Sequence, residues 1–213
     1  QLLSWGGVYR AMRWAHASSV DLVHWVHHPI ALTPSEDGYD RMGCWRGGAF
    51  VTREGVPAVI YEGGYVGACI ATAEDDLLVR WTKHPANPVL NGDLPWLAGM
   101  AYLYGAVERH PETRKLRMWY QSYYRVNDKD PVVNVMCLAE STNGLDWKFP
   151  RLGLVADGRG SKDNNIIFSS LTHSGFDECI TPTRNPHATD PGKRYRSLFW
   201  ANSNGHRGTY AAW

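Results

Sequence analysis

The sequence predicts an all-β fold and, within that class, a β-propeller built from four-stranded antiparallel blades. Three observations predict it: a turn motif ending in Trp recurs along the chain, aromatic-rich strands lie between its copies, and the composition favours strands and turns. The 213 residues include 10 Trp, 11 Tyr, 21 Gly and 12 Pro, a mixture that suits strands joined by tight turns. The most helical stretch, residues 75–81, is too short to be more than a turn.

The turn motif begins with small residues that end a strand, continues through a turn rich in Asp or Asn, and closes with an apolar residue and Trp. Its three copies are residues 16–25, 71–81 and 139–147, which end in Trp25, Trp81 and Trp147. These Trp residues are 56 and then 66 positions apart. That spacing fits one four-stranded blade per copy and is too long for ankyrin or tetratricopeptide repeats.

Between the motifs lie three segments that predict half-buried antiparallel strands, because apolar or aromatic residues alternate with polar ones. They are residues 56–61, 115–120 and 194–200. Each follows a segment rich in Gly, Pro, Glu or Lys that predicts a hairpin turn. The turns are residues 53–55, 110–114 and 190–193. The third unit is longer by about one loop, which coincides with the polar residues 157–165 and is typical of a binding rim.

The repeats divide the chain into approximate blades within one partial propeller domain, residues 1–213. The blade repeats are residues 1–42, 43–100, 101–175 and 176–213. They amount to about three complete blades, whereas closed propellers have four to eight. We therefore expect the chain to be part of a larger propeller.

Charge and hydropathy exclude several partners. The chain has 22 basic and 21 acidic side chains, for a net charge of +1, and no basic run. We therefore expect no nucleic-acid partner and no attachment to an anionic membrane. The longest apolar stretches, residues 57–61 and 132–138, are far shorter than the ~20 residues that a membrane-spanning helix needs.

The sequence predicts neither a metal site nor a cofactor. The four cysteines are Cys44, Cys69, Cys137 and Cys179. They are far apart and form no CxxC pair, so we interpret them as buried free thiols in preference to disulfides. The adjacent His27 and His28 would point to opposite faces of a strand and could not share a metal ion. The glycine-rich residues 43–48 lack the Lys and the following helix of a phosphate-binding loop.

Four segments near the start of the chain carry a family resemblance. They are residues 12–25, 29–34, 39–40 and 43–49. In order and spacing they resemble the N-terminal half of glycoside hydrolase family 32, the invertases, inulinases and levanases. The match covers about residues 5–90, and from Tyr102 onward the chain looks like uncharacterised bacterial propeller sugar hydrolases. The resemblance implies a five-bladed propeller that binds carbohydrate and hydrolyses β-fructosides with retention, by means of two carboxyls about 5 Å apart.

Two acidic residues of that family have no clear counterpart here. Its nucleophile is an Asp in a Trp-Met-Asn-Asp-Pro-Asn-Gly motif that the 213 residues do not contain, so we expect it either upstream of Gln1 or absent from the protein. The chain alone should then be inactive. A second family Asp, in Arg-Asp-Pro, binds substrate hydroxyls, but Leu-Tyr-Gly stands at that place, residues 103–105. Glu108 is the nearest carboxylate, with a solvated charge at a strand end as its alternative interpretation.

The family's general acid is a Glu in a Glu-Cys motif, and Glu178 followed by Cys179 stands at the matching place in its repeat. The resemblance therefore implies that Glu178 is the catalytic acid. A carboxyl beside apolar and aromatic groups can retain its proton near neutral pH. A structural role for Glu178 stays open, and Asp177, which would face the other side of the strand, is the second candidate.

Four more residues match family segments at the sugar site. Trp45 and Arg46 stand where the family has an aromatic residue and a Ser, which implies that Trp45 stacks on a sugar. Arg46 would either bind an acidic or unusual sugar or block the pocket. Trp14 and His16 match a Trp-Gly-His-Ala segment, with core packing as their alternative role.

The sequence thus predicts a glycosidase that acts on β-fructosides or a related sugar. A carbohydrate-binding propeller without catalysis is one alternative, suggested by the missing Arg-Asp-Pro and by Arg46. A propeller glycosidase with a different sugar specificity is another, suggested by the looser second half of the chain. An Asp-bearing first-blade motif in the full-length gene would favour the enzyme.

Overall fold

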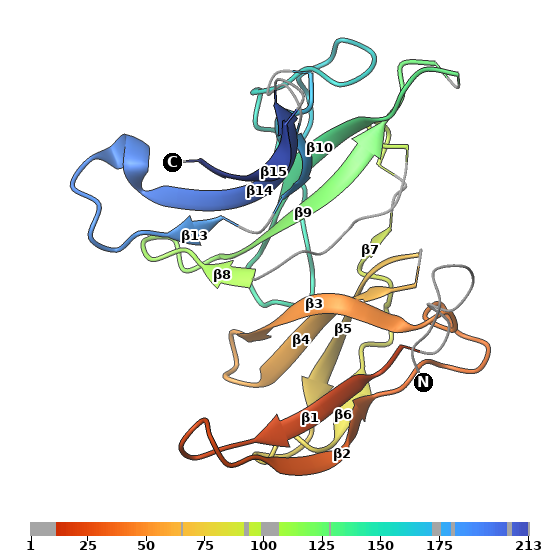
Figure 1. The fold of residues 1–213 in the computed structure, drawn as a ribbon. Helices are drawn as coiled ribbons and strands as arrows, with labels where there is room; N and C mark the ends of the chain where they lie inside the picture. Colours follow the sequence, from red (N-terminus) through yellow and green to blue (C-terminus); the bar gives the residue numbers. More distant parts are fainter. Residues whose placement is uncertain are drawn as a thin grey trace.

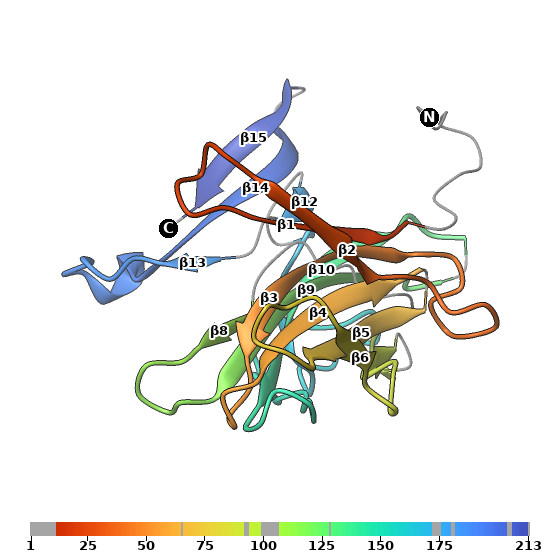
Figure 2. The same cartoon turned by 90° about the horizontal axis from the view of Figure 1, so that it is seen from below.

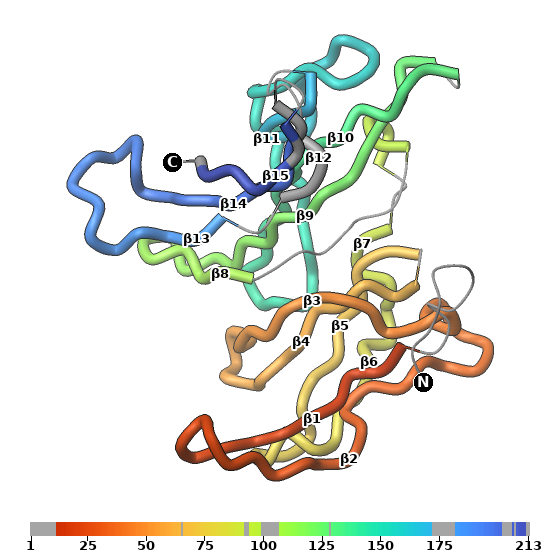
Figure 3. Tube along the Cα trace, in the orientation of Figure 1, coloured from red at the N-terminus to blue at the C-terminus, as the bar shows by residue number. Residues whose placement is uncertain are grey.

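The computed structural model describes residues 12–64, 66–91, 94–98, 107–127, 129–171, 176–179, 182–203 and 206–212, with the side chains of residues 176–179, 202, 203, 207 and 212 outside that description. The described strands form four antiparallel sheets that follow one another along the chain (Figures 1 and 3). The only helix in the described ranges is the 3₁₀ turn η1 (Pro191–Lys193). The predicted all-β class is therefore confirmed.

The first two sheets come from the N-terminal half of the chain. The first is a hairpin of β1 (Trp14–Ser18) and β2 (Val26–Leu32). The second has the order β3–β4–β5–β6, with β7 also paired with β5. Its strands are β3 (Cys44–Val51), β4 (Pro57–Gly63), β5 (Gly67–Ala73), β6 (Trp81–Lys83) and β7 (Leu90–Asn91).

The third and fourth sheets repeat the same hairpin order. The third runs β8–β9–β10–β11, and in the fourth β14 pairs with β12 and β13 along one side and with β15 along the other. The strands of the third sheet are β8 (Val107–Arg109), β9 (Leu116–Tyr124), β10 (Val133–Ser141) and β11 (Ile166–Ser169). Those of the fourth are β12 (Phe176–Cys179), β13 (Thr183–Arg184), β14 (Tyr195–Ser203) and β15 (His206–Ala212).

The recurring turn motif has two features in common in all three copies. In each copy an Asp or Asn side chain accepts hydrogen bonds from backbone N–H groups a few residues further on, and the acceptors are Asp21, Asp75 and Asn143. The residue three positions before each Trp has a positive φ. These residues are Leu22 (62°), Leu78 (57°) and Gly144 (94°). The turns predicted from Asp and Asn are therefore confirmed, because their chemistry is local.

The strands predicted to be half-buried differ in how they are covered. β4 and β9 are buried on both faces along most of their length, so that prediction is wrong for residues 56–61 and 115–120. The second and third sheets are covered on both faces because neighbouring sheets stack against them (Figure 2). β14 alternates between more and less exposed residues, as predicted. All three predicted hairpin turns join paired antiparallel strands.

The core lies between the sheets. The largest cluster joins the second and third sheets, where Ile60 and Ile70 meet Met118 and Val135. A smaller cluster joins the third and fourth sheets, with Trp119 and Leu138 packed near Phe199 and Tyr195. The face of the second sheet towards β1 and β2 carries a third cluster that includes Tyr61 and Cys69.

The polar residues 157–165 connect β10 to β11 and only partly form the predicted rim. Residues 159–163 are exposed, but Asn164 and Asn165 have no exposed surface. The Asn165 side chain accepts a hydrogen bond from Trp96 Nε1 at 2.8 Å and donates to the Tyr120 hydroxyl, also at 2.8 Å. A buried amide with its partners in place belongs to the core, so the rim prediction is wrong for these two residues.

The burial of the described cysteines agrees with the sequence-based prediction. Cys44, Cys69 and Cys137 are free and buried, as predicted, whereas the side chain of Cys179 lies outside the described residues. Among the described residues, no helix has the length and the apolar character needed to cross a membrane.

Candidate functional site

Trp14 and Trp45 meet where β3 begins. Trp14 lies on β1, and its Nε1 donates a hydrogen bond to the carbonyl oxygen of Trp45 at 2.6 Å. Trp45 is 9% exposed, so most of its surface is covered within this chain. Gly43 makes room for its ring, because a Cβ at Gly43 would lie 2.5 Å from Trp45 Nε1, and the φ of Gly43, +142°, favours glycine. These contacts hold the backbone of Trp45 and leave room for its ring at the start of the strand.

Arg46 forms an ion pair with Glu62 of the neighbouring strand β4. Arg46 Nε lies 3.3 Å from Glu62 Oε2, and the Glu62 side chain is fully buried while that of Arg46 is 44% exposed. The β3–β4 register shifts between Cys44 and Gly47, which places Arg46 in an irregular part of the strand. A buried carboxylate needs a cation beside it. Arg46 therefore has a structural partner, in addition to either role that the sequence predicted for it.

His16 lies on the β1–β2 hairpin, opposite His28 in the register. The two ring centroids are 4.5 Å apart with a 33° tilt, and His28 Nε2 lies 2.7 Å from the hydroxyl oxygen of Ser18. The Nδ1 atom of His16 is buried without a hydrogen-bond partner among the described residues. The His16 ring thus contacts a residue of its own hairpin, which is consistent with the packing alternative.

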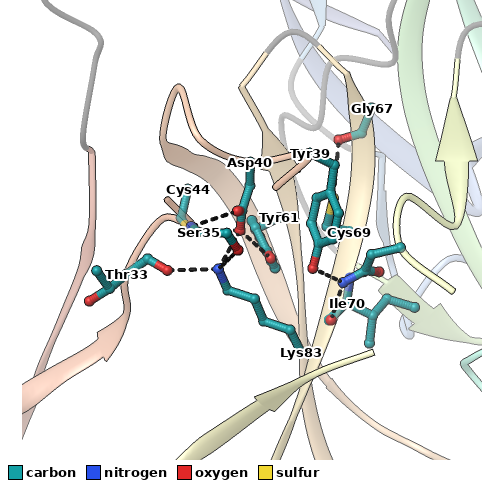
Figure 4. A network of polar contacts seen from close by, with 11 residues as sticks. Thr33, Ser35, Tyr39, Asp40, Cys44, Tyr61, Gly67, Cys69, Ile70 and Lys83 are labelled. Atoms are coloured by element: carbon teal, nitrogen blue, oxygen red, sulfur yellow. Dashed lines mark hydrogen bonds and ion pairs between the residues drawn. The ribbon is translucent and has the colours of Figure 1, made fainter. Parts of the chain in front are cut away.

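Asp40 is the centre of a polar network in the loop before β3 (Figure 4). Its fully buried carboxylate lies 2.6 Å from Lys83 Nζ, which comes from β6. The Tyr61 hydroxyl donates to Asp40 Oδ2 at 2.9 Å, and the backbone N–H of Ser35 donates to Oδ1 at 2.9 Å. Lys83 also donates to the carbonyl oxygen of Thr33 at 2.7 Å. The network therefore attaches the loop that leads to Trp45 and Arg46 to strands β4 and β6.

The Asp40 network sets the protonation of its neighbours. Burial disfavours the charged form of Asp40, but Lys83 and the hydrogen bonds from Ser35 and Tyr61 outweigh burial and lower the pKa of that carboxyl. Burial, together with the charge of Asp40, raises the pKa of Cys44 to about 12 and that of Tyr61 well above its ordinary value. Asp40 is therefore a charged structural group paired with Lys83, whereas the neighbouring Cys44 and Tyr61 stay neutral.

Glu108 lies on β8, opposite Arg117 in the β8–β9 register. Its Oε2 atom is buried without a hydrogen-bond partner among the described residues. Burial raises the pKa of Glu108, while the nearby Arg184, Arg117 and His110 oppose the rise. Residues 103–105, the place of the second family Asp, lie outside the described residues.

Glu178 and Asp177 lie on β12, the strand that precedes β13 and the turn η1. Glu178 pairs with Trp200 of β14, and the register shifts between Phe176 and Glu178, so Asp177 stands at the irregular position. Such bulges change the direction of side chains. The side chains of both acidic residues are outside the description, whereas their predicted place, before the hairpin of the fourth sheet, is confirmed by the backbone.

The structure therefore brings together Trp14, Trp45 and Arg46, with His16 on the same hairpin as Trp14, and places Glu178 on another sheet. Sequence reasoning missed the Glu62 partner of Arg46. The available signal was a single carboxylate at the end of the apolar residues 57–61. No group of three or more His, Cys, Asp or Glu side chains within the described ranges could hold a metal ion.

Comparisons with known proteins give matches over the N-terminal part of this chain. Residues 1–149 match the model of the glycosyl hydrolases family 32 N-terminal domain. The acid beta-fructofuranosidase of Phaseolus vulgaris is 38% identical over 92 residues, or 40% of this chain and 14% of that protein. The sucrose:sucrose 1-fructosyltransferase of Festuca arundinacea is 39% identical over 94 residues, or 41% of this chain and 14% of that protein. The match thus spans about one seventh of each relative.

Solved structures of similar proteins agree with the fold. Fructan 1-exohydrolase IIa of Cichorium intybus superposes with a TM-score of 0.59 at 20% identity, covering 93% of this chain and 36% of that one. Exo-inulinase of Aspergillus awamori gives a TM-score of 0.54 at 17% identity, covering 93% and 41%. At these identities the likeness supports the fold alone, and it confirms the predicted β-propeller.

Proposed function

Because this chain belongs to glycosyl hydrolase family 32, we propose that the complete protein hydrolyses β-fructosides or a related sugar with retention. The observation that carries the proposal is the family match over residues 1–149. The two relatives described above are named for β-fructoside hydrolysis and fructosyl transfer, which are both reactions of fructosyl groups. The substrate class follows from those names.

In the proposed mechanism Glu178 protonates the leaving oxygen and then activates water for the second step. The Glu178-Cys179 pair at the matching place of its repeat supports this role. The attacking carboxylate comes from outside these 213 residues, because the chain lacks the family's nucleophile motif. Only the part of Trp45 that is not covered within this chain, 9% of its surface, is available to contact the sugar, and Asp177 is the alternative acid. Trp14 and His16 support the start of β3 and the adjacent hairpin.

A second candidate function is carbohydrate binding or hydrolysis of a different sugar. Arg46 stands where the resembling family has Ser, and it carries a buried partner, Glu62. This pair changes both the charge and the volume next to Trp45. A sugar with an acidic group could approach the exposed part of the Arg46 guanidinium, whereas a neutral fructosyl group gains less from it.

The experiment is to express the complete protein and measure fructose released from sucrose and inulin. Matched assays contain uronate-bearing oligosaccharides and a neutral arabinan. Fructose release with retained configuration supports the first function. Binding of one of these sugars without turnover supports a binding propeller, and turnover confined to a sugar other than a fructoside moves the specificity away from fructosides.

A further inference from the structure

The fold gathers cations that lie far apart in the sequence. The β3–β4 and β8–β9 hairpins lie next to each other, beside the turn that follows β10 (Figure 1). The β13–β14 connection lies on the same side of the molecule. A cleft of about 310 Å³ lies there. Its lining residues are Arg53, Arg109, Thr113, Arg114, Lys115 and Thr142. Four of these six side chains are cationic, although the whole chain carries a net charge of only +1.

Arg109 builds this cleft by joining two sheets. Its guanidinium donates hydrogen bonds to the carbonyl oxygens of Val51 at 2.8 Å and Thr52 at 3.2 Å, and to that of Arg114 at 3.1 Å. The acceptors are neutral carbonyls, so the charge of Arg109 is held in place without a carboxylate. The β3–β4 hairpin and the β8–β9 hairpin are therefore fixed relative to one another.

Arg53 and Arg114 supply the cations available to a ligand. Both are exposed, and neither guanidinium makes a hydrogen bond or ion pair with the part of the chain that the structure describes. Lys115 Nζ, by contrast, lies 2.9 Å from Glu140 Oε2, and Arg117 Nε lies 3.1 Å from Oε1 of the same carboxylate. The cleft thus has two unengaged guanidinium groups beside two cations that the protein itself holds.

A larger cleft of about 530 Å³ continues from the first and shares Lys115 and Thr142 with it. It adds the hydroxyl of Ser141, the ammonium group of Lys148 and the carboxyls of Glu140 and Asp146. Both carboxyls already have partners, since Glu140 is paired as above and Asp146 accepts a hydrogen bond from Asn143 at 2.8 Å. The acidic residues in the turns of the two hairpins, Glu54 and Glu112, are exposed.

We propose that the cleft formed by Arg53, Arg109, Thr113, Arg114, Lys115 and Thr142 binds the anionic groups of an acidic polysaccharide, either sulfates or uronates. Guanidinium groups match the two oxygens of such anions, and the threonine hydroxyls can bond sugar hydroxyls. The smaller cleft has no aromatic side chain on which a nucleic-acid base could stack, and the larger one has a single aromatic residue, Phe149. This site lies at the Val51 end of β3, whereas Trp45 lies at the other end.

The test is the affinity of the complete protein for sulfated dextran and for polygalacturonate at about 50 mM salt, measured by calorimetry, with unsulfated dextran as the neutral probe. The variant Arg53→Gln/Arg114→Gln should weaken binding of at least one acidic polymer by about tenfold or more. The sulfate and uronate arms show which anion is recognised. Melting temperature checks the fold in each variant, independently of any fructoside hydrolysis.

The matched control is Arg41→Gln/Arg159→Gln, which removes the same charge from two exposed arginines outside the cleft. It should leave binding of the acidic polymers within about twofold of wild type. Equal losses in both double variants would mean general charge attraction and overturn the proposal. Binding of unsulfated dextran as tight as that of both acidic polymers, tighter binding of single-stranded DNA, or no binding of either acidic polymer would also overturn it.

Discussion

Lys83 Nζ lies 2.6 Å from Asp40 Oδ2, so an ion pair joins β6 to the loop that precedes β3. The two residues are separated by most of the second sheet in sequence, and the carboxylate is fully buried. Tyr61 and Ser35 complete its hydrogen bonds. The geometry of Trp45 and Arg46 at the start of β3 therefore depends on a contact outside the proposed site.

Replacing Lys83 by Met should lower the free energy of unfolding by about 3–5 kcal/mol, because it leaves the buried Asp40 carboxylate without its cation. The double variant Asp40→Asn/Lys83→Met should lose less than Lys83→Met alone. Urea unfolding near neutral pH measures both. A double variant that is less stable than the single one would contradict the assigned pairing.

The Asp40–Lys83 ion pair should make the stability of the protein depend on pH. The pKa of Asp40 is lowered in the folded state from an ordinary value of 3.8, so its contribution to stability is fully present above that value and is lost as the pH falls through the lower folded pKa. In Lys83→Met, burial should raise the pKa of Asp40 above its unfolded value. That variant should then lose stability as the pH rises through the raised value. The measurement is the free energy of unfolding of the variant and of wild type over acidic pH. If the two change with pH in parallel, the prediction is wrong.

Replacing Arg46 by Gln should destabilise the protein by about 3–5 kcal/mol, since the buried Glu62 carboxylate would lose the cation that lies 3.3 Å from it. Arg46→Gln/Glu62→Gln should recover part of that loss. A double-mutant cycle by urea unfolding measures the coupling between the two residues. If the losses of the two single variants add up to that of the double variant, Arg46 and Glu62 do not stabilise each other.

Replacing Gly144 by Ala should be more costly than the same change at Gly55. Both have a positive φ, 94° and 86°, so both variants acquire backbone strain of about 1 kcal/mol. Only at Gly144 would the new Cβ also lie 2.7 Å from Phe50 Cε2, which adds about 1–3 kcal/mol of overpacking. Thermal unfolding compares the two variants. Equal losses would show that Phe50 moves aside freely.

Thiol labelling tests the burial of the cysteines. In a Cys179→Ser variant, Cys44, Cys69 and Cys137 should react with an aromatic disulfide reagent only when the protein unfolds, because all three are buried and burial raises their pKa. The measurement is the number of thiols that react before and after urea is added. Rapid reaction of a native thiol would place that cysteine at the surface.

The sequence predicted the features that depend on local chemistry. The three turns follow from Asp21, Asp75 and Asn143, whose side chains bond backbone groups only a few residues away. It did not predict that β4 and β9 are buried on both faces, because that depends on a neighbouring sheet. The Arg46–Glu62 pair was missed because a register shift between Cys44 and Gly47 breaks the alternation on which strand reasoning relies. The cationic cleft could not be predicted from a basic run in the sequence either, because its arginines come from separate hairpins.

The most direct test of the proposed function is Glu178→Gln in the complete protein, assayed on sucrose and on an aryl β-fructoside with a good leaving group. We expect a loss of about 10²–10⁴-fold on sucrose, because its leaving group needs a proton. The aryl substrate, which needs no proton, should still give a burst of product and then stall at hydrolysis of the covalent intermediate. Asp177→Asn is the matched control and should retain sucrose turnover. Equal losses on both substrates, together with a lower melting temperature for Glu178→Gln, would contradict the assignment of Glu178 as the acid.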